Sequence, residues 1–274
     1  MMVIMRRVFT IAAAFAAALL LSTGAMASEG SLKFESAHVD VRDAESLQAG
    51  ARTFVNYCLN CHSASVVRYN RLKDIGLTED QIKENLLFTA DKVGELMTVS
   101  MNRKDAKEWF GAAPPDLSVI ARTRGPDWLY TYLRTFYRDP STVTGWNNLV
   151  FERVAMPHVL WTLQGQPTLD IKSFKSEHEA EAARIQARSF ALVAEEGEGD
   201  AKRYLVKTVK VESPGALSTA QYDGVVRDLV NFLTWMGEPA QELRKQIGVV
   251  VLLVLGLLTA LSWLLYKSFW KDVH

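Results

Sequence analysis

Two cysteines and a histidine form a compact motif in the first quarter of the chain. Cys58 and Cys61 are separated by two residues and His62 follows directly, which is the C-x-x-C-H pattern of c-type haem attachment. Two thiols about one turn apart can add to the two vinyl groups of one haem, and His62 then lies under the iron as its proximal ligand. The sequence has two cysteines in all. The motif therefore predicts one covalent haem c.

Two other chemistries use paired cysteines. A thiol-disulfide oxidoreductase has C-x-x-C at the start of a helix that follows a strand, whereas this motif ends a helical stretch and precedes a histidine. A structural zinc site needs further ligands at characteristic spacing. The remaining histidines are scattered through the chain: His38, His158, His178 and His274. Both alternatives are less favoured than haem attachment.

An electron-carrying haem needs a sixth iron ligand, because an open position invites oxygen or peroxide chemistry. Met156 is the preferred candidate, since Pro157 restricts its loop and apolar residues on both sides could wall a dry crevice. Met101 and His158 are the alternatives. The other methionines of the mature chain, Met97 and Met236, fall at helical spacing among apolar residues, where methionine fills core gaps. A His/Met pair favours ferrous iron and raises the reduction potential.

The two ends of the chain carry apolar segments of different kinds. Residues 1–27 predict a cleaved signal peptide, with Arg6 and Arg7 before an apolar run and Ala-Met-Ala at 25–27. Residues 247–266 carry no charge and suffice to cross a hydrocarbon core of ~30 Å as a helix. The alternatives, a first transmembrane helix and a buried core helix, fit the length and the flanking charges less well.

Basic residues flank the second apolar segment on both sides, so the orientation follows from the export signal. We expect residues 28–246 to form a haem domain on the periplasmic side of a bacterial inner membrane, with residues 267–274 as a cytoplasmic tail.

Hydrophobic periodicity predicts the elements that must position the motif. Helices are expected at residues 48–58, 78–87, 127–137 and 221–235. Consecutive prolines exclude helix from residues 111–116. Residues 164–220 are richer in charged and small side chains and are interpreted as a surface insertion. Within it we expect a polar helix at 177–188 and short strands at 190–194 and 204–211.

These residues resemble the class I cytochromes c in general and the cytochrome c1 family of the cytochrome bc complex in particular. Gly50, Phe54 and Cys58 match the opening Gly-x-x-x-Phe-x-x-x-Cys, in which the glycine lets the first and last helices cross closely. Leu229 and Phe232 resemble the residues of the family's last helix that pack against the first helix. The more specific blocks are CLNCHSASVVRYNRL, GAAPPDLSVIARTR, VAMPHVLWTLQG and FLTWMGEPAQELRKQIG.

The resemblance implies a mainly α fold, namely a class I cytochrome c-like haem domain with a surface insertion and one C-terminal transmembrane helix. It implies Cys58 and Cys61 as thioether sites and His62 and Met156 as axial ligands. Three further roles are implied: the Pro115 carbonyl accepts from the His62 ring, Leu117 packs on the haem edge, and Arg122 and Arg124 lie near the propionates.

The function implied is that of the electron-transfer subunit of a ubiquinol-cytochrome c reductase. Single electrons would come from the Rieske iron-sulfur protein, which works with cytochrome b, and pass to a soluble cytochrome c, within a complex that is normally dimeric. No side chain of the chain itself is expected to act as acid, base or nucleophile.

Other functions are compatible with fewer of these features. One is a stand-alone anchored cytochrome that feeds a terminal oxidase or reductase, and another is a haem enzyme or gas sensor with an open sixth position. Nucleic acid is not an expected partner, because 31 basic residues balance 31 acidic ones.

Overall fold

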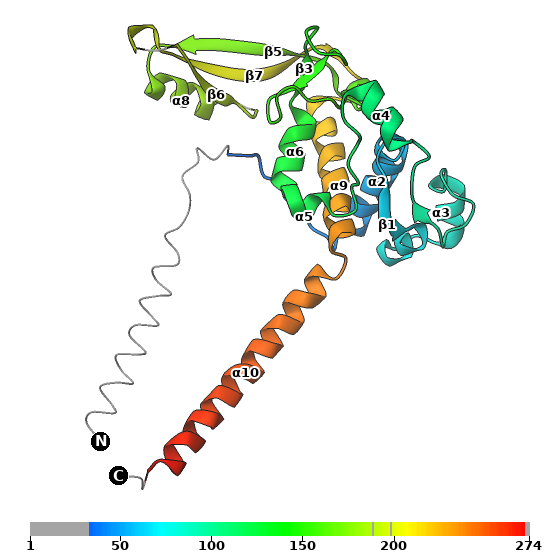
Figure 1. Cartoon of the computed structure of the whole chain (residues 1–274), viewed down its shortest axis with the longest axis vertical. Helices are drawn as coiled ribbons and strands as arrows, with labels where there is room; N and C mark the ends of the chain where they lie inside the picture. Colours follow the sequence, from blue (N-terminus) through cyan, green and yellow to red (C-terminus); the bar gives the residue numbers. More distant parts are fainter. Residues whose placement is uncertain (1–32, 188, 198, 272–274) are drawn as a thin grey trace. The chain divides into compact units, whose positions relative to one another are not determined.

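The structure is a computed structural model that describes residues 33–187, 189–197 and 199–271 (Figure 1). The chain divides into two compact units. One is Phe34–Glu242, and the other combines Met1–Lys33 with Leu243–His274. The predicted signal peptide lies outside the described residues, as do the last three residues of the predicted cytoplasmic tail.

The larger unit is built around helices. They are α2 (Ala44–Thr53), α3 (Glu79–Asn85), α4 (Arg103–Phe110), α5 (Ile120–Arg124), α6 (Pro126–Arg134), α7 (Trp161–Gln164), α8 (Glu177–Gln186) and α9 (Thr219–Gly237). Two antiparallel strand pairs join them, formed by β1 (Ala64–Arg68) with β2 (Leu96–Met97) and by β3 (Phe136–Arg138) with β4 (Trp146–Asn148). Most buried apolar side chains of this unit belong to one core cluster, to which α2, α6 and α9 contribute.

The first and last helices of this unit cross in close contact, which requires a glycine. A Cβ atom built on Gly50 of α2 would lie 2.1 Å from the Asp228 carbonyl oxygen and 2.6 Å from Phe232 Cβ of α9. The Phe54 and Phe232 rings pack beside this crossing with centroids 5.6 Å apart. The close helix crossing predicted at Gly50 is confirmed, and it fixes the helix that leads into the cysteine motif.

The predicted helices occur, although α3, α6 and α8 each end two or three residues before the expected position. Helix α3 begins with a complete capping box between Thr78 and Gln81. The helix expected over residues 127–137 ends at Arg134, and Phe136 begins strand β3 instead. The expectation was wrong there because β3 pairs with β4 ten residues further on, which helical periodicity does not reveal.

Residues 165–214 form a three-stranded antiparallel sheet with one helix. Its strands are β5 (Gly165–Phe174), β7 (Arg203–Pro214) and β6 (Leu192–Glu196), hydrogen-bonded in the order β5-β7-β6. Ala180 of α8 packs with Ala191 and Val206 in a small cluster of its own. The sheet is larger than the two short strands expected. Strand β5 was not predicted although Leu169 and Ile171 alternate with polar residues, because the alternation is short and includes Pro167, a residue that argues against a strand interior.

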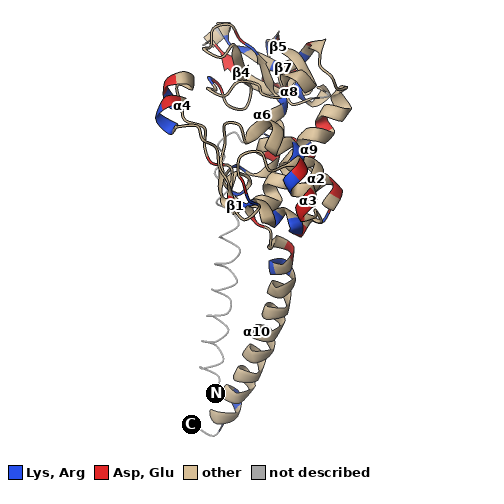
Figure 2. Ribbon diagram, turned by 90° about the vertical axis from the view of Figure 1, so that its right-hand side faces the viewer, with Lys and Arg blue, Asp and Glu red and all other residues tan. Residues whose placement is uncertain are grey.

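The second unit contains most of α10 (Gln241–Phe269). Among the described residues it is the one helix whose length and apolar composition suit a membrane span, with a mean hydropathy of 2.6 over its most apolar window. None of its residues is buried within the chain. Figure 2 shows charged residues near its two ends and an uncharged stretch between them, which contains the expected span at residues 247–266.

Candidate haem site

The cysteine motif lies where helix α2 loses its regular hydrogen bonding. The helix continues as a π-helical turn, Phe54–Cys58, and the amides of Cys61 and His62 then both donate to the Cys58 carbonyl, at 3.0 and 2.9 Å. This turn brings the two thiols and the imidazole to one wall of a cavity. No disulfide joins these two cysteines. Burial and the neighbouring Cys61 raise the pKa of Cys58 to about 12, and burial also raises the pKa of Cys61.

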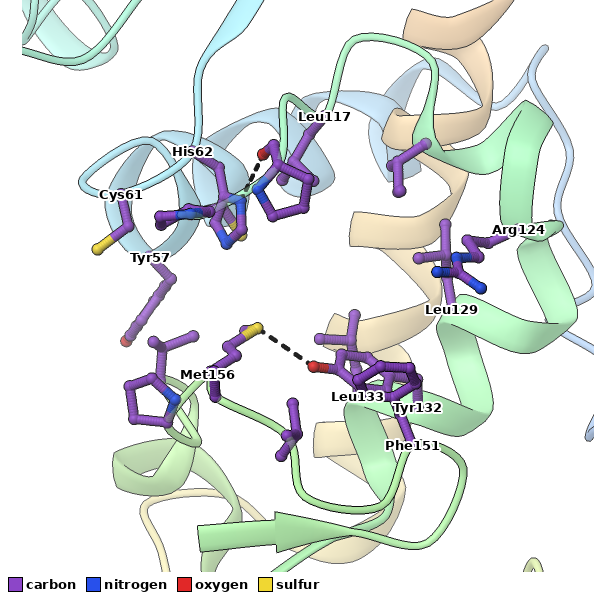
Figure 3. Close-up of a pocket in the computed structure, with 18 of the residues that line it drawn as sticks. Tyr57, Cys61, His62, Leu117, Arg124, Leu129, Tyr132, Leu133, Phe151 and Met156 are labelled. Carbon is purple, nitrogen blue, oxygen red and sulfur yellow. Dashed lines mark hydrogen bonds between the residues drawn. The ribbon is translucent and has the colours of Figure 1, made fainter. Parts of the chain in front are cut away.

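The His62 ring is oriented by a hydrogen bond to the backbone. Its Nδ1 lies 2.7 Å from the Pro115 carbonyl oxygen (Figure 3). A carbonyl can only accept a hydrogen bond, so Nδ1 carries the proton. In the neutral ring the lone pair of Nε2 is then available to bind a metal. Burial lowers the pKa of His62, although the Pro115 hydrogen bond and the nearby Asp116 act in the opposite direction. The imidazole therefore has the tautomer and charge of a metal ligand.

The proline segment that holds His62 is itself fastened to the residues after the motif. The Leu117 amide donates to the Ser63 carbonyl at 2.8 Å, and the Asp116 carboxylate accepts from the amides of Ser65 and Ser118, each at 2.8 Å. Burial alone would raise the pKa of Asp116, but hydrogen bonds from Ser118 and Ser65 lower it. An ionised Asp116 thus holds the backbone of this segment so that the Pro115 carbonyl stays within hydrogen-bonding distance of the His62 ring.

Met156 lies on the wall that faces His62. Figure 3 shows the two side chains directed into the same space from opposite sides. The thioether sulfur accepts a hydrogen bond from the Tyr132 hydroxyl of α6 at 3.5 Å. Tyr132 stacks on Trp128, with ring centroids 4.8 Å apart, so its position is set by the helix that carries it.

The cavity between these walls has a volume of about 370 Å³. Its lining is mostly apolar and comes from segments far apart in sequence. Besides the two thiols, His62 and Met156, the lining includes Leu117, Arg124, Phe151, Val154, Leu229 and Leu233. A low-dielectric space of this kind suits a flat and largely apolar macrocycle.

The predicted site residues are brought together with one exception. Cys58, Cys61, His62, Pro115, Leu117, Arg124 and Met156 all line the cavity. Arg122 does not, because its side chain turns toward α9, where its Cγ would be 3.4 Å from a Cβ on Gly237. The expectation that Arg122 lies near the propionates thus receives no support from this structure, whereas Arg124 lies at the cavity with its guanidinium 5.1 Å above the Trp128 ring.

The other candidates for the sixth ligand lie elsewhere. Met97 and Met236 are buried in the core, as expected of methionines at helical spacing. Neither Met101 nor His158 is among the lining residues. The His158 ring is buried between Phe136 and Trp146, with both centroid distances 5.0 Å. Of these described side chains, Met156 alone faces His62.

Sequence reasoning missed Tyr132 as a member of the site. Helical periodicity over residues 127–137 places Tyr132 on the buried side of a helix and indicates no role for its hydroxyl. The available signal was a polar-tipped aromatic on a core-facing side, because a buried tyrosine hydroxyl usually has a partner.

The donor set and the walls fit a covalent haem c. Two thiols on one turn, a neutral imidazole with Nε2 available, an opposing thioether and a mostly apolar cavity are the features such a group requires. Arg124 at the cavity offers a positive charge for a propionate.

Comparison with known proteins agrees with this geometry. The model of the Cytochrome C1 family matches residues 34–168 and 215–273, and the unmatched stretch falls within the predicted insertion. A cytochrome c1 from Allochromatium vinosum is 46% identical over 257 residues, which cover 93% of this chain and 96% of that protein.

Two further relatives extend the comparison. A protein from Nitrosomonas europaea named ammonia monooxygenase gamma subunit is 46% identical over 243 residues, which cover 89% of this chain and 90% of that protein. A cytochrome c1 from Rhodospirillum rubrum is 29% identical over 251 residues, covering 84% and 83%. The C-x-x-C-H turn, the opposed histidine and methionine, and these matches agree, and the chain belongs to the cytochrome c1 family.

Proposed function

We propose that this chain is the c-type haem subunit of a membrane-bound quinol:cytochrome c oxidoreductase. It holds one haem c through thioether bonds to Cys58 and Cys61, with His62 and Met156 as axial ligands, in a class I cytochrome c-like domain. It accepts single electrons from the Rieske iron-sulfur subunit, which works with cytochrome b, and passes them to a soluble cytochrome c.

One observation carries this proposal: His62 and Met156 face each other across a mostly apolar cavity whose same wall holds both thiols. Family membership and a relative named cytochrome c1 that matches nearly the whole chain support the same function.

The haem supplies the one-electron chemistry when bound, and the chain determines its ligands, its potential and its access to water. Pro115 keeps Nδ1 of His62 protonated and leaves Nε2 for the iron. The soft Met156 thioether favours the lower oxidation state. The apolar walls act in the same direction, because a low dielectric disfavours the additional positive charge of the oxidised centre.

The expected topology completes the proposal. Residues 1–27 direct export and are removed, residues 28–246 form the periplasmic domain with its insertion at about 164–220, residues 247–266 cross the inner membrane, and residues 267–274 form the cytoplasmic tail. The length and apolar composition of α10 support the membrane span. The complex is a dimer, as is usual for this family.

A second candidate function is a stand-alone anchored cytochrome that feeds another membrane enzyme, such as a terminal oxidase or reductase. One observation favours this candidate: the Nitrosomonas europaea relative is named as a subunit of a different enzyme, ammonia monooxygenase. Both functions use the same haem site and differ in the proteins bound to it.

Purification of the tagged, full-length chain from native membranes in a mild detergent separates the two. We expect it to copurify with a cytochrome b and a Rieske subunit, and the preparation to reduce soluble cytochrome c with a quinol. Recovery with a monooxygenase, oxidase or reductase, and without cytochrome b and a Rieske subunit, would contradict the proposed complex and leave the haem site intact.

A further inference from the structure

The loop that carries Met156 follows strand β4 and contains no helix or strand before the methionine. Such a segment has to satisfy its backbone amides by other means, because an unpaired buried N–H is costly. Two consecutive asparagines, Asn147 and Asn148, end β4 just before the loop. Both side chains are buried, with 5% and 1% of their surfaces exposed.

The Asn148 side chain accepts hydrogen bonds from the first residues of the loop. Its Oδ1 accepts from the amides of Val150 at 2.8 Å and Phe151 at 3.2 Å. Its Nδ2 donates to the Tyr132 carbonyl at 2.7 Å. Asn148 thus connects the loop to the residue whose hydroxyl contacts the Met156 sulfur.

The Asn147 side chain accepts a hydrogen bond from a residue further along the loop. Its Oδ1 accepts from the Arg153 amide at 2.8 Å and from the Asn148 amide at 2.9 Å. Its Nδ2 donates to Asp139 Oδ2 at 2.8 Å. Arg153 has a φ of 57°, a left-handed conformation that a non-glycine residue adopts at a cost. The hydrogen bond to Asn147 stabilises this conformation three residues before Met156.

Together the two asparagine oxygens accept four main-chain amides, and three of these belong to the loop between β4 and Met156. The loop residues that follow, from Val154 to Pro157, line the cavity. We propose that Asn147 and Asn148 are positioning residues that hold the Met156 thioether toward the iron. This inference rests on the proposed role of Met156 as the sixth ligand.

The test uses the full-length holoprotein in detergent, as wild type, Asn148→Ala, Asn147→Ala and the exchange Asn147→Asp with Asp139→Asn. The exchange keeps an acceptor for the Arg153 amide and reverses the donor and acceptor of the bond between residues 139 and 147. Asn231→Ala is the matched control. Asn231 is also 2% exposed, and its Nδ2 donates to the Asp40 carbonyl and to Ser46, remote from the loop.

Two readouts report on the loop itself. One is hydrogen exchange at the amides of Val150, Phe151 and Arg153. The other is the absorption band that arises from ferric iron bound to a thioether, recorded with carbon monoxide binding to the reduced protein. We expect each alanine variant to speed hydrogen exchange by about tenfold at the amides it releases, which is the change expected for one lost hydrogen bond. Each should also weaken the absorption band and gain carbon monoxide binding. The double variant Asn147→Asp/Asp139→Asn and Asn231→Ala should keep the band.

Retention of the band by both alanine variants, or loss of it in Asn231→Ala to the same degree, would overturn the inference. If an alanine variant fails to fold, Asn147→Asp alone is measured beside the double variant Asn147→Asp/Asp139→Asn. The single variant brings two carboxylates together in place of the hydrogen bond between residues 147 and 139 and should weaken the band, whereas the double variant restores that bond and should keep it. Equal bands in these two variants would overturn the inference. Met156→Ala is measured in parallel. If that variant leaves the band unchanged, the proposed ligand itself is wrong, which separates this failure from failure of the positioning role.

Discussion

The Tyr132 hydroxyl donates a hydrogen bond to the Met156 sulfur at 3.5 Å and so connects helix α6 to the loop that carries the methionine. Burial raises the pKa of Tyr132 above the ordinary value of a tyrosine, about 10, so the hydroxyl carries its proton at neutral pH. A donated hydrogen bond withdraws electron density from the thioether and weakens its donation to an oxidised metal.

Tyr132→Phe should therefore lower the reduction potential, by a few tens of millivolts if about 1 kcal/mol is lost from one oxidation state. A redox titration of the holoprotein measures this. Tyr222→Phe is the matched control, because Tyr222 is also buried but its hydroxyl donates to the Leu133 carbonyl at 2.8 Å. Equal shifts in both variants would contradict a specific effect of the sulfur contact.

Gly50→Ala should destabilise the protein by about 3 kcal/mol or more, because the added Cβ would overlap the backbone of α9. Chemical denaturation of the holoprotein measures the loss. Gly94→Ala serves as the control, since nothing lies within 4 Å of its Cβ position, and it should change stability by less than about 1 kcal/mol. Similar stabilities for the two variants would show that the helix crossing is looser than described.

The pH dependence of stability is expected to have opposite signs at two carboxyl groups. Burial raises the pKa of Glu35 despite its ion pair with Arg134, which also binds Asp223 through two hydrogen bonds of 2.6 and 2.8 Å. The folded state thus keeps the Glu35 proton to a higher pH than the unfolded state, whose pKa is about 4.3. Its contribution to stability is present below that pH and is lost as the pH rises toward the folded pKa.

The stability difference between wild type and Glu35→Gln should accordingly shrink as the pH rises from about 4. For exposed Glu79, hydrogen bonds from Lys73 and Lys83 lower the pKa to about 2, so the difference between wild type and Glu79→Gln should grow as the pH rises from that value. Unfolding midpoints of both pairs across this range provide the measurement. A difference at Glu35 that grows with pH would mean that the ion pair outweighs burial.

Cys58→Ala and Cys61→Ala should each leave the haem attached by one bond, and the double variant should leave it without a covalent bond. Mass spectrometry and haem staining after denaturing electrophoresis distinguish these states. His178→Ala, on the surface helix α8, is a suitable control. Haem that stays covalently attached in the double variant would disprove thioether attachment at this motif.

Short sequence segments were sufficient to predict the thioether cysteines and the two axial ligands. The C-x-x-C-H motif, the resemblance that assigned Pro115, and the proline after Met156 depend on short segments, and the structure brings all of them to one cavity. The capping box of α3 follows from residue types and spacing, and the crossing at Gly50 was implied by the family resemblance.

What could not be predicted depends on contacts between distant segments. Strand β3 is specified by its pairing with β4 rather than by its own periodicity. Strand β5 has a short alternation around Leu169 and Ile171, but its full length is set by the pairing with β7. The role of Tyr132 needs the fold that brings α6 to the methionine loop. Arg122 and Arg124 are two residues apart on one short helix, and only the direction of each side chain shows which one reaches the cavity.

The most direct test of the haem site is the reduced-minus-oxidised spectrum of the solubilised chain, wild type beside Met156→Ala, with carbon monoxide added to the reduced forms. The proposed coordination predicts a low-spin wild type that does not bind carbon monoxide and a variant that binds it and has a lower reduction potential. Rapid binding of carbon monoxide by the wild type would contradict the His62/Met156 assignment and favour a haem enzyme or gas sensor.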